Sequence, residues 1–94
     1  MYLVRNTFVA KPGCAGKLAT LLKDSLASFD MEGARVMTDA TGDFNRVIME
    51  HTVESLDEFE KKRQEIMSSP TYREQMANTI DLWVSGSRDI LRIV

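Results

Sequence analysis

The sequence predicts an α+β domain in which a four-stranded antiparallel sheet carries helices on one face. Apolar residues alternate with period two in four segments, as in strands, and recur at spacings of three and four in the segments between them, as in amphipathic helices. These segments follow the order strand, helix, strand, strand, helix, short helix, strand. A chain of 94 residues has room for one domain, so we assign residues 1–94 to a single unit.

The first half of the chain predicts a strand, a helix and a hairpin. The strand over Tyr2–Ala10 ends at Lys-Pro-Gly (residues 11–13), because proline has no amide proton for a ladder and glycine permits a turn. The helix over Cys14–Phe29 has one apolar stripe, and the polar break at Asp30–Gly33 ends it. The stripe consists of Leu18, Leu21, Leu22, Leu26 and Phe29. Strands over Ala34–Ala40 and Phe44–Val53, joined by a loop with one glycine, should then form an antiparallel hairpin.

The second half predicts two helices and a last strand. Ser55 and Glu58 form a capping box that starts a helix, and a Ser-Pro pair at residues 69–70 starts a shorter one. The pattern of the shorter helix continues until Ser-Gly-Ser at residues 85–87, and the last strand covers Arg88–Val94. Its helical spacing is marked by Tyr72, Met76, Ile80 and Trp83.

Two βαβ units joined by a hairpin give the ferredoxin-like, split-βαβ fold. Right-handed crossovers place the first and third strands in the middle of the sheet and both main helices on one face. The other face should then alternate between apolar and polar residues, yet the first and last strands are apolar on both faces. We therefore expect a homodimer through the open sheet face, and because that face also carries polar residues, the dimer interior should be a cavity rather than a dry seam.

Composition and charge exclude several functions. The balance of 12 basic and 14 acidic residues lacks the basic excess of a nucleic-acid binder. No apolar run approaches the roughly 18 residues of a membrane span, and no signal peptide is visible. The single cysteine, Cys14, predicts a reducing cytoplasm, and it is either a small residue at a helix start or a thiolate favoured by the helix dipole. No nucleotide, flavin or metal motif is present, so we expect no cofactor and no metal.

Three residues are candidates for catalysis. His51 is the only histidine, and its near-neutral pKa suits proton transfer, although a histidine on an apolar strand face also serves as a structural residue. Asn6 shares a strand face with Val4 and Phe8, so its burial requires a hydrogen-bonding partner or a ligand. Tyr72 would orient a substrate or move a proton.

Four residues are candidates for substrate binding. Arg46 and Glu50 lie four apart on one strand face, either in ion pairs or in a binding site where Arg46 stabilises developing negative charge. Met76 and Trp83 belong to a stripe of aromatic and thioether side chains, which forms either core or the wall of a ligand site.

The chain resembles the dimeric α/β-barrel superfamily, which includes antibiotic-biosynthesis monooxygenases, NIPSNAP-like proteins and heme-degrading monooxygenases. The resemblance rests on Phe-Val-Ala-Lys-Pro-Gly (8–13), on Val-Ile-Met-Glu-His (47–51) leading to Glu-Ser-Leu (54–56), and on Ser-Pro-x-Tyr-Arg (69–73). It is closest to the NIPSNAP-like branch and implies a homodimer with a pocket between sheet and helices in each subunit. Asn6 matches an asparagine of the heme-degrading relatives, but Lys62 and Met76 stand where their tryptophan and iron-ligating histidine would lie, so heme is not expected.

Two hypotheses about function follow. In the first, the dimer is a cofactor-independent monooxygenase-like enzyme that acts on a small apolar or aromatic molecule through Asn6, His51 and Tyr72. In the second, it is a non-catalytic module that binds a ligand or serves in assembly, because the sequence contains no strong constellation of acid, base and nucleophile.

Overall fold

One antiparallel sheet with strand order β2-β3-β1-β4 organises the protein, so β1 and β3 occupy its middle as the sequence predicts. The computed structural model describes residues 1–29, 31 and 33–94 and confirms the ferredoxin-like α+β fold. The elements are β1 (Tyr2–Ala10), α1 (Ala15–Ser28), β2 (Arg35–Thr38), β3 (Arg46–Val53), α2 (Leu56–Met67), α3 (Pro70–Thr79), the short 3-10 helix η1 (Ile80–Leu82) and β4 (Trp83–Arg92). The expected break at Asp30–Gly33 falls partly outside the described residues.

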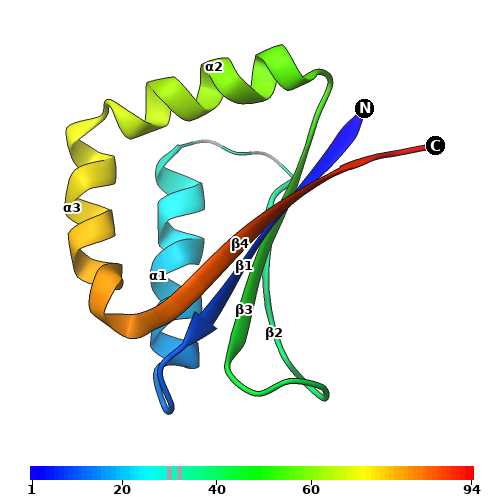
Figure 1. Ribbon diagram of the computed structural model, residues 1–94. Coiled ribbons are helices and arrows are strands. Elements are labelled where there is room, and N and C mark those ends of the chain that lie inside the picture. Colours follow the sequence, from blue (N-terminus) through cyan, green and yellow to red (C-terminus); the bar gives the residue numbers. More distant parts are fainter. Residues whose placement is uncertain (30, 32) are drawn as a thin grey trace.

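The helices lie on one side of the sheet and leave its other face bare. In Figure 1 the sheet is seen nearly edge-on, with α1 and α3 to its left and α2 across the top. Side chains alternate along β1, so Val4 and Asn6 face the helices while Leu3 and Arg5 face the bare side. No helix in the described part of the chain is long and apolar enough to cross a bilayer.

The hydrophobic core lies between α1 and the two central strands. Leu18 and Val47 are fully buried there, and Leu22 and Ala10 pack with them. The predicted stripe of α1 explains this packing, because residues four apart project from the same side of a helix. Trp83 is partly buried and packs against this cluster, and it also lines a cavity next to the core.

The predicted capping signals are present at both later helices. The side chain of Ser55 accepts a hydrogen bond from the amide of Glu58 at 3.1 Å, while the Glu58 carboxylate accepts one from the amide of Glu54 at 2.9 Å. Ser69 caps α3 by accepting from the amide of Thr71 at 3.2 Å. These caps make α2 and α3 two separate helices, which meet at an angle over the sheet (Figure 1).

The prediction that Trp83 belongs to a helix is wrong. Helix α3 ends at Thr79, and Trp83 is the first residue of β4, which begins five residues before the expected Arg88 and ends at Arg92 rather than Val94. Gly86, taken in the sequence as part of a break, lies within the strand. A β-carbon there would be 3.5 Å from the Thr7 carbonyl oxygen and 3.7 Å from the Phe8 and Trp83 rings, which are ordinary van der Waals contacts.

The hairpin of β2 and β3 is confirmed, with shorter strands than predicted. The expected start of β3 at Phe44 is wrong, because that residue lies in the loop between β2 and β3 and is 88% exposed. The loop includes two residues with left-handed backbone, Gly42 at φ 115° and Asn45 at φ 67°. Such conformations are incompatible with a strand, so the ladder starts only at Arg46.

Candidate functional site

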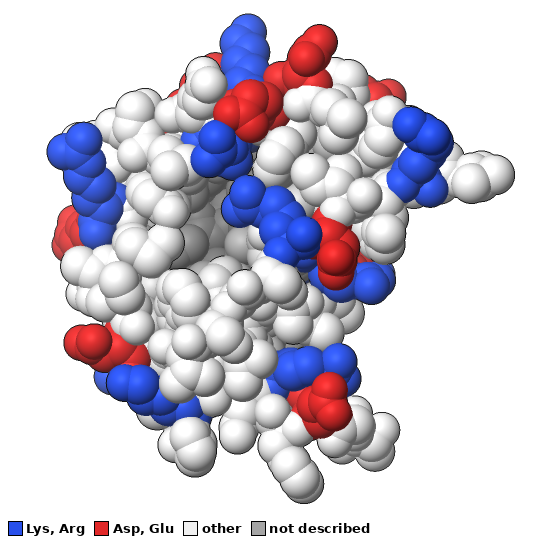
Figure 2. All heavy atoms as spheres, in the orientation of Figure 1, with Lys and Arg blue, Asp and Glu red and all other residues white. Residues whose placement is uncertain are grey.

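A cavity of about 270 Å³ lies between the sheet and the three helices. Figure 2 shows the surface hollowed between the helices and the sheet, with Lys and Arg side chains along one edge of the hollow. Its walls are mostly apolar and come from every helix and from three strands. The apolar lining residues are Phe8, Leu22, Leu26, Phe29, Met31, Met49, Phe59, Ile66, Met67, Met76 and Trp83, with Tyr72 beside them. A small concave site with apolar walls and a few polar groups is typical of small-molecule binding.

Five of the seven predicted site residues line this cavity, namely Asn6, His51, Tyr72, Met76 and Trp83. The sheet explains the first two, because Asn6 and His51 both point to the helix face of adjacent central strands. Tyr72 and Met76 lie four residues apart on α3 and so share one side of that helix. Trp83 reaches the cavity from β4, where its ring makes an edge-to-face contact with Phe8 at 5.4 Å between centroids.

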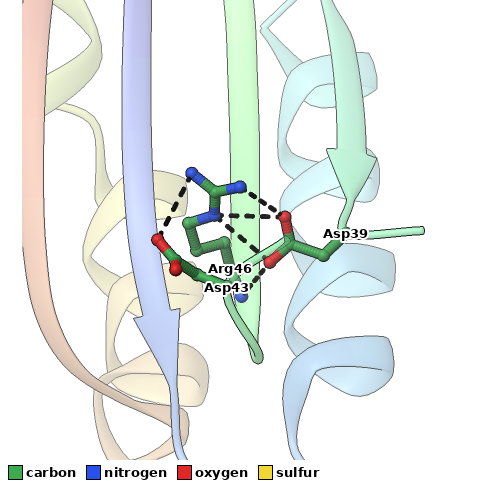
Figure 3. Close-up of polar contacts among 3 residues, drawn as sticks. All are labelled: Asp39, Asp43 and Arg46. Atoms are coloured by element: carbon green, nitrogen blue, oxygen red, sulfur yellow. Dashed lines mark hydrogen bonds and ion pairs between the residues drawn. The ribbon is translucent and has the colours of Figure 1, made fainter. Parts of the chain in front are cut away.

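Arg46 and Glu50, predicted to bind substrate, do not line the cavity. Successive side chains of a strand point to opposite faces, and Arg46 and Glu50 are each an odd number of positions from His51. Both therefore lie on the bare face of β3. Figure 3 shows Arg46 held at the hairpin loop, where its guanidinium is 2.8 Å from Asp39 and 3.8 Å from Asp43. The hydrogen bonds from Arg46 hold the pKa of Asp39 below its usual range. This arrangement closes the hairpin and matches the ion-pair interpretation of Arg46.

Glu50 is the centre of a second ionic group on the bare face. Its carboxylate lies 2.7 Å from the Arg5 guanidinium and 3.0 Å from that of Arg35, and its side chain is only 5% exposed. Hydrogen bonds from Arg5, and then from Arg35, lower the pKa of Glu50 despite its burial. Glu50 is therefore ionised and paired in the middle of the sheet.

Asn6 has a partner that sequence analysis did not single out. It is 8% exposed, and its amide oxygen accepts a hydrogen bond from Nε of Arg88 at 2.7 Å. The register of β1 and β4 places the two residues directly opposite each other. The sequence separates them by 82 positions, and no local pattern relates them. Arg88 also lines the cavity, with its guanidinium carbon 5.4 Å from the centre of the Phe59 ring.

His51 combines burial with an unused ring nitrogen. Its Nδ1 atom is buried and has no hydrogen-bond partner within the described residues. The imidazole stacks on the Phe59 ring at 6.5 Å between centroids. Burial, and secondarily the positive charge of Arg88, lower the pKa of His51. The imidazole is thus neutral near pH 7, and its unpartnered Nδ1 lies where a group in the cavity could form a hydrogen bond with it.

The lowered pKa of His51 predicts a pH-dependent stability. An unfolded histidine has a pKa of about 6.5, and the folded value lies below it, so the unfolded chain binds more protons between the two values. The free energy of unfolding should therefore be highest above about pH 6.5 and fall as the pH drops to the folded pKa of His51. Urea denaturation at a series of pH values measures this dependence of the free energy of unfolding on pH. In His51→Gln this fall should vanish, and an unchanged pH profile would contradict the assignment.

Further lining residues were missed as site residues, among them Phe59, Arg63 and Gln75. The Gln75 amide nitrogen donates to the Ser28 hydroxyl at 3.1 Å, while its buried Oε1 has no partner within the described residues. Cys14 instead packs against the α1 core cluster, in agreement with a small residue at a helix start. No group of His, Cys, Asp and Glu side chains in the described part of the chain is arranged to hold a metal ion.

Comparison with solved structures confirms the resemblance at the level of the fold. A protein from Agrobacterium tumefaciens superposes with a TM-score of 0.89 at 16% identity, over 100% of this chain and 94% of that one. An uncharacterised NIPSNAP domain protein from Burkholderia xenovorans gives 0.86 at 13% identity, over 100% and 95%. A candidate antibiotic biosynthesis monooxygenase from Chloroflexus aurantiacus gives 0.73 at 18% identity, over 99% and 92%.

These superpositions show that the chain shares a ferredoxin-like fold with NIPSNAP and antibiotic biosynthesis monooxygenase-like proteins. No family model matches the chain. No curated protein matches it in sequence.

Proposed function

We propose that this protein binds a small, mostly apolar or aromatic molecule in the cavity and removes a proton from it with His51, as a cofactor-independent monooxygenase-like enzyme. The observation that carries the proposal is the buried, unpartnered Nδ1 atom of a neutral histidine in a cavity whose walls are mostly apolar. A ligand hydroxyl that donates to this nitrogen would satisfy it, and a ligand that fills the cavity would keep water from competing. The candidate monooxygenase among the structural neighbours supports this class of reaction.

The aromatic walls favour a flat ligand. Phe59 stacks on His51 from α2, and Trp83 and Phe8 meet edge-to-face at another part of the wall. Aromatic rings bind one another in stacked or edge-to-face arrangements, and the methionines in the wall adapt to ligand shape because their side chains are unbranched and flexible. Tyr72 and Gln75 lie on one side of α3 and supply polar groups that would orient such a ligand.

We also propose that two copies associate through the bare sheet face. Leu3 and Leu91 pair across β1 and β4 on that face, and Leu91 is 44% exposed in the single chain. Ile48 lies on the same face of β3. A second copy would cover these side chains by packing sheet against sheet, whereas in a monomer they would remain in water. The ionic group around Glu50 would then lie within the dimer and give the association its orientation.

The alternative is a non-catalytic ligand-binding dimer. One observation favours it: no described residue makes a hydrogen bond with His51 Nδ1, so no second group orients the imidazole as in an established base dyad. Under this alternative, the same cavity would hold its ligand without turnover. The two functions share the binding site and differ only in the role of His51.

Oxygen uptake separates the two functions. We expect the protein to bind 2-naphthol in calorimetry, and to consume oxygen with 1,4-dihydroxynaphthalene faster than the spontaneous reaction. In His51→Gln, oxygen uptake should fall by roughly 100-fold while 2-naphthol still binds, because only the proton acceptor is lost. Thr20→Gln, at an exposed position of α1 outside the cavity and away from the bare sheet face, is the control. Binding without protein-dependent oxygen uptake would support the non-catalytic alternative, and absence of binding would contradict both.

A further inference from the structure

The described residues that line the cavity include cationic side chains and no anionic ones. Lys62, Arg63 and Arg88 contribute to its wall, and no Asp or Glu among the described residues does. The charge of Arg63 is neutralised by Glu60, which does not line the cavity and whose carboxylate lies 2.7 Å from the Arg63 guanidinium. Arg88 has no carboxylate within ion-pair distance in the described part of the chain. Among the described residues, the wall therefore contains positive charge that no other side chain of the wall balances.

Arg88 is held in place without being neutralised. Its Nε atom donates to the neutral amide oxygen of Asn6 at 2.7 Å, and its guanidinium lies over the Phe59 ring. The structure gives its two terminal nitrogens no hydrogen-bond partner among the described residues, so this end of the guanidinium remains available. Two parallel N–H groups of this kind match the two oxygens of a carboxylate.

The charge of Arg88 acts on its surroundings in the direction expected of an unbalanced cation. It contributes to the lowered pKa of His51, after burial, and adds to the effect of Arg63 in lowering the pKa of Glu60. The positive charge of Arg88, which disfavours a second cation at His51, favours an anion in the same place, whereas burial disfavours a charge of either sign.

We propose that the ligand of the cavity is a small apolar acid bound as its anion, with its carboxylate on the terminal nitrogens of Arg88. This inference rests on the proposed function and names the class of ligand. The apolar body of the acid lies against Phe59 and Trp83, and any hydroxyl it carries is within the part of the cavity that contains His51. Asn6 is a positioning residue, since it orients Arg88 through Nε and leaves the charge free for the ligand.

A pair of probes of the same shape tests this proposal. Calorimetry compares 2-naphthoate, which is anionic at pH 7.5, with the neutral 2-naphthamide. Wild-type protein should bind the naphthoate roughly 10- to 100-fold more tightly, which is the range expected for charge-assisted hydrogen bonds. In Arg88→Gln this preference should fall to within about threefold, because the two terminal N–H groups of the guanidinium and its positive charge are both lost. Arg73→Gln removes one positive charge from an exposed site outside the cavity and should preserve the preference.

Asn6→Asp provides a second variant that keeps Arg88 in place. An aspartate there would pair with the guanidinium and neutralise it, so the naphthoate preference should again be lost while 2-naphthamide still binds. Circular dichroism checks that each variant is folded, and either variant alone decides the question. Equal binding of both probes to wild-type protein would overturn the inference and leave the proposed function standing, as would a preference that persists in Arg88→Gln or Asn6→Asp. Binding of neither probe would overturn both.

Discussion

Leu91→Lys should convert the protein from a dimer into a folded monomer. Leu91 lies on the bare sheet face opposite Leu3 and is 44% exposed in the single chain, so a lysine there finds water in the monomer. In a sheet-to-sheet dimer the same ammonium would be buried without a partner, which costs several kcal/mol and weakens association by roughly 1,000-fold or more. The mass measured by native mass spectrometry should fall from twice 10.6 kDa to 10.6 kDa.

A matched substitution elsewhere controls for the added charge. Ile80 is 55% exposed on η1, on the helix side of the sheet, so Ile80→Lys makes the same kind of change away from the bare face. This variant should remain dimeric at the concentrations where Leu91→Lys is monomeric. A wild-type protein of 10.6 kDa in solution, or a Leu91→Lys variant that is still dimeric, would contradict association through this face.

Leu18→Ala should cause the largest loss of stability of any single truncation that we expect the fold to survive. Leu18 is fully buried beneath the sheet, where it packs with Leu22 and Val47. Removing its side chain loses the transfer free energy and leaves a cavity, at a cost of about 3–5 kcal/mol. That is a large fraction of the roughly 5–14 kcal/mol expected for a domain of this size. Urea denaturation measures the change.

Leu56→Ala is the control for this truncation. Leu56 begins α2 and is 48% exposed, so the same chemical change should cost less than about 1 kcal/mol. Because Leu18 does not line the ligand cavity, Leu18→Ala should still bind 2-naphthoate under conditions where it is folded. A loss in Leu18→Ala no larger than that in Leu56→Ala would contradict the placement of the core between α1 and the central strands.

Local patterns in the sequence predict most of the fold. The leucine stripe of α1, the capping box at Ser55 and the hairpin signal all act over a few residues, and the structure confirms each of them. The last strand was placed too late because Gly86 was interpreted as a break. Its place within the strand depends on pairing with Phe8 of β1, which lies far away in the sequence.

The site was less predictable because it depends on which face of the sheet the helices cover. Strand parity places Arg46 and Glu50 on one face and His51 on the other, but both faces are apolar, so the sequence does not tell which one meets the helices. Arg88 was missed for a different reason. Its role depends on the register of β4 against β1, which sets it opposite Asn6 and cannot be read from either segment alone.

Methionine methyl groups offer the most direct test of the central claim, that the cavity between sheet and helices is a small-molecule site. Four of the six methionines line it, namely Met31, Met49, Met67 and Met76, whereas Met1 and Met37 do not. Met37 pairs with Ile48 on the bare face and reports on the opposite side of the sheet. In NMR spectra of protein with ¹³C-labelled methionine methyls, titration with 2-naphthoate should shift the four cavity signals through the ring current of the probe and leave Met1 and Met37 unchanged. Shifts confined to Met37, or none at saturating probe, would contradict the claim.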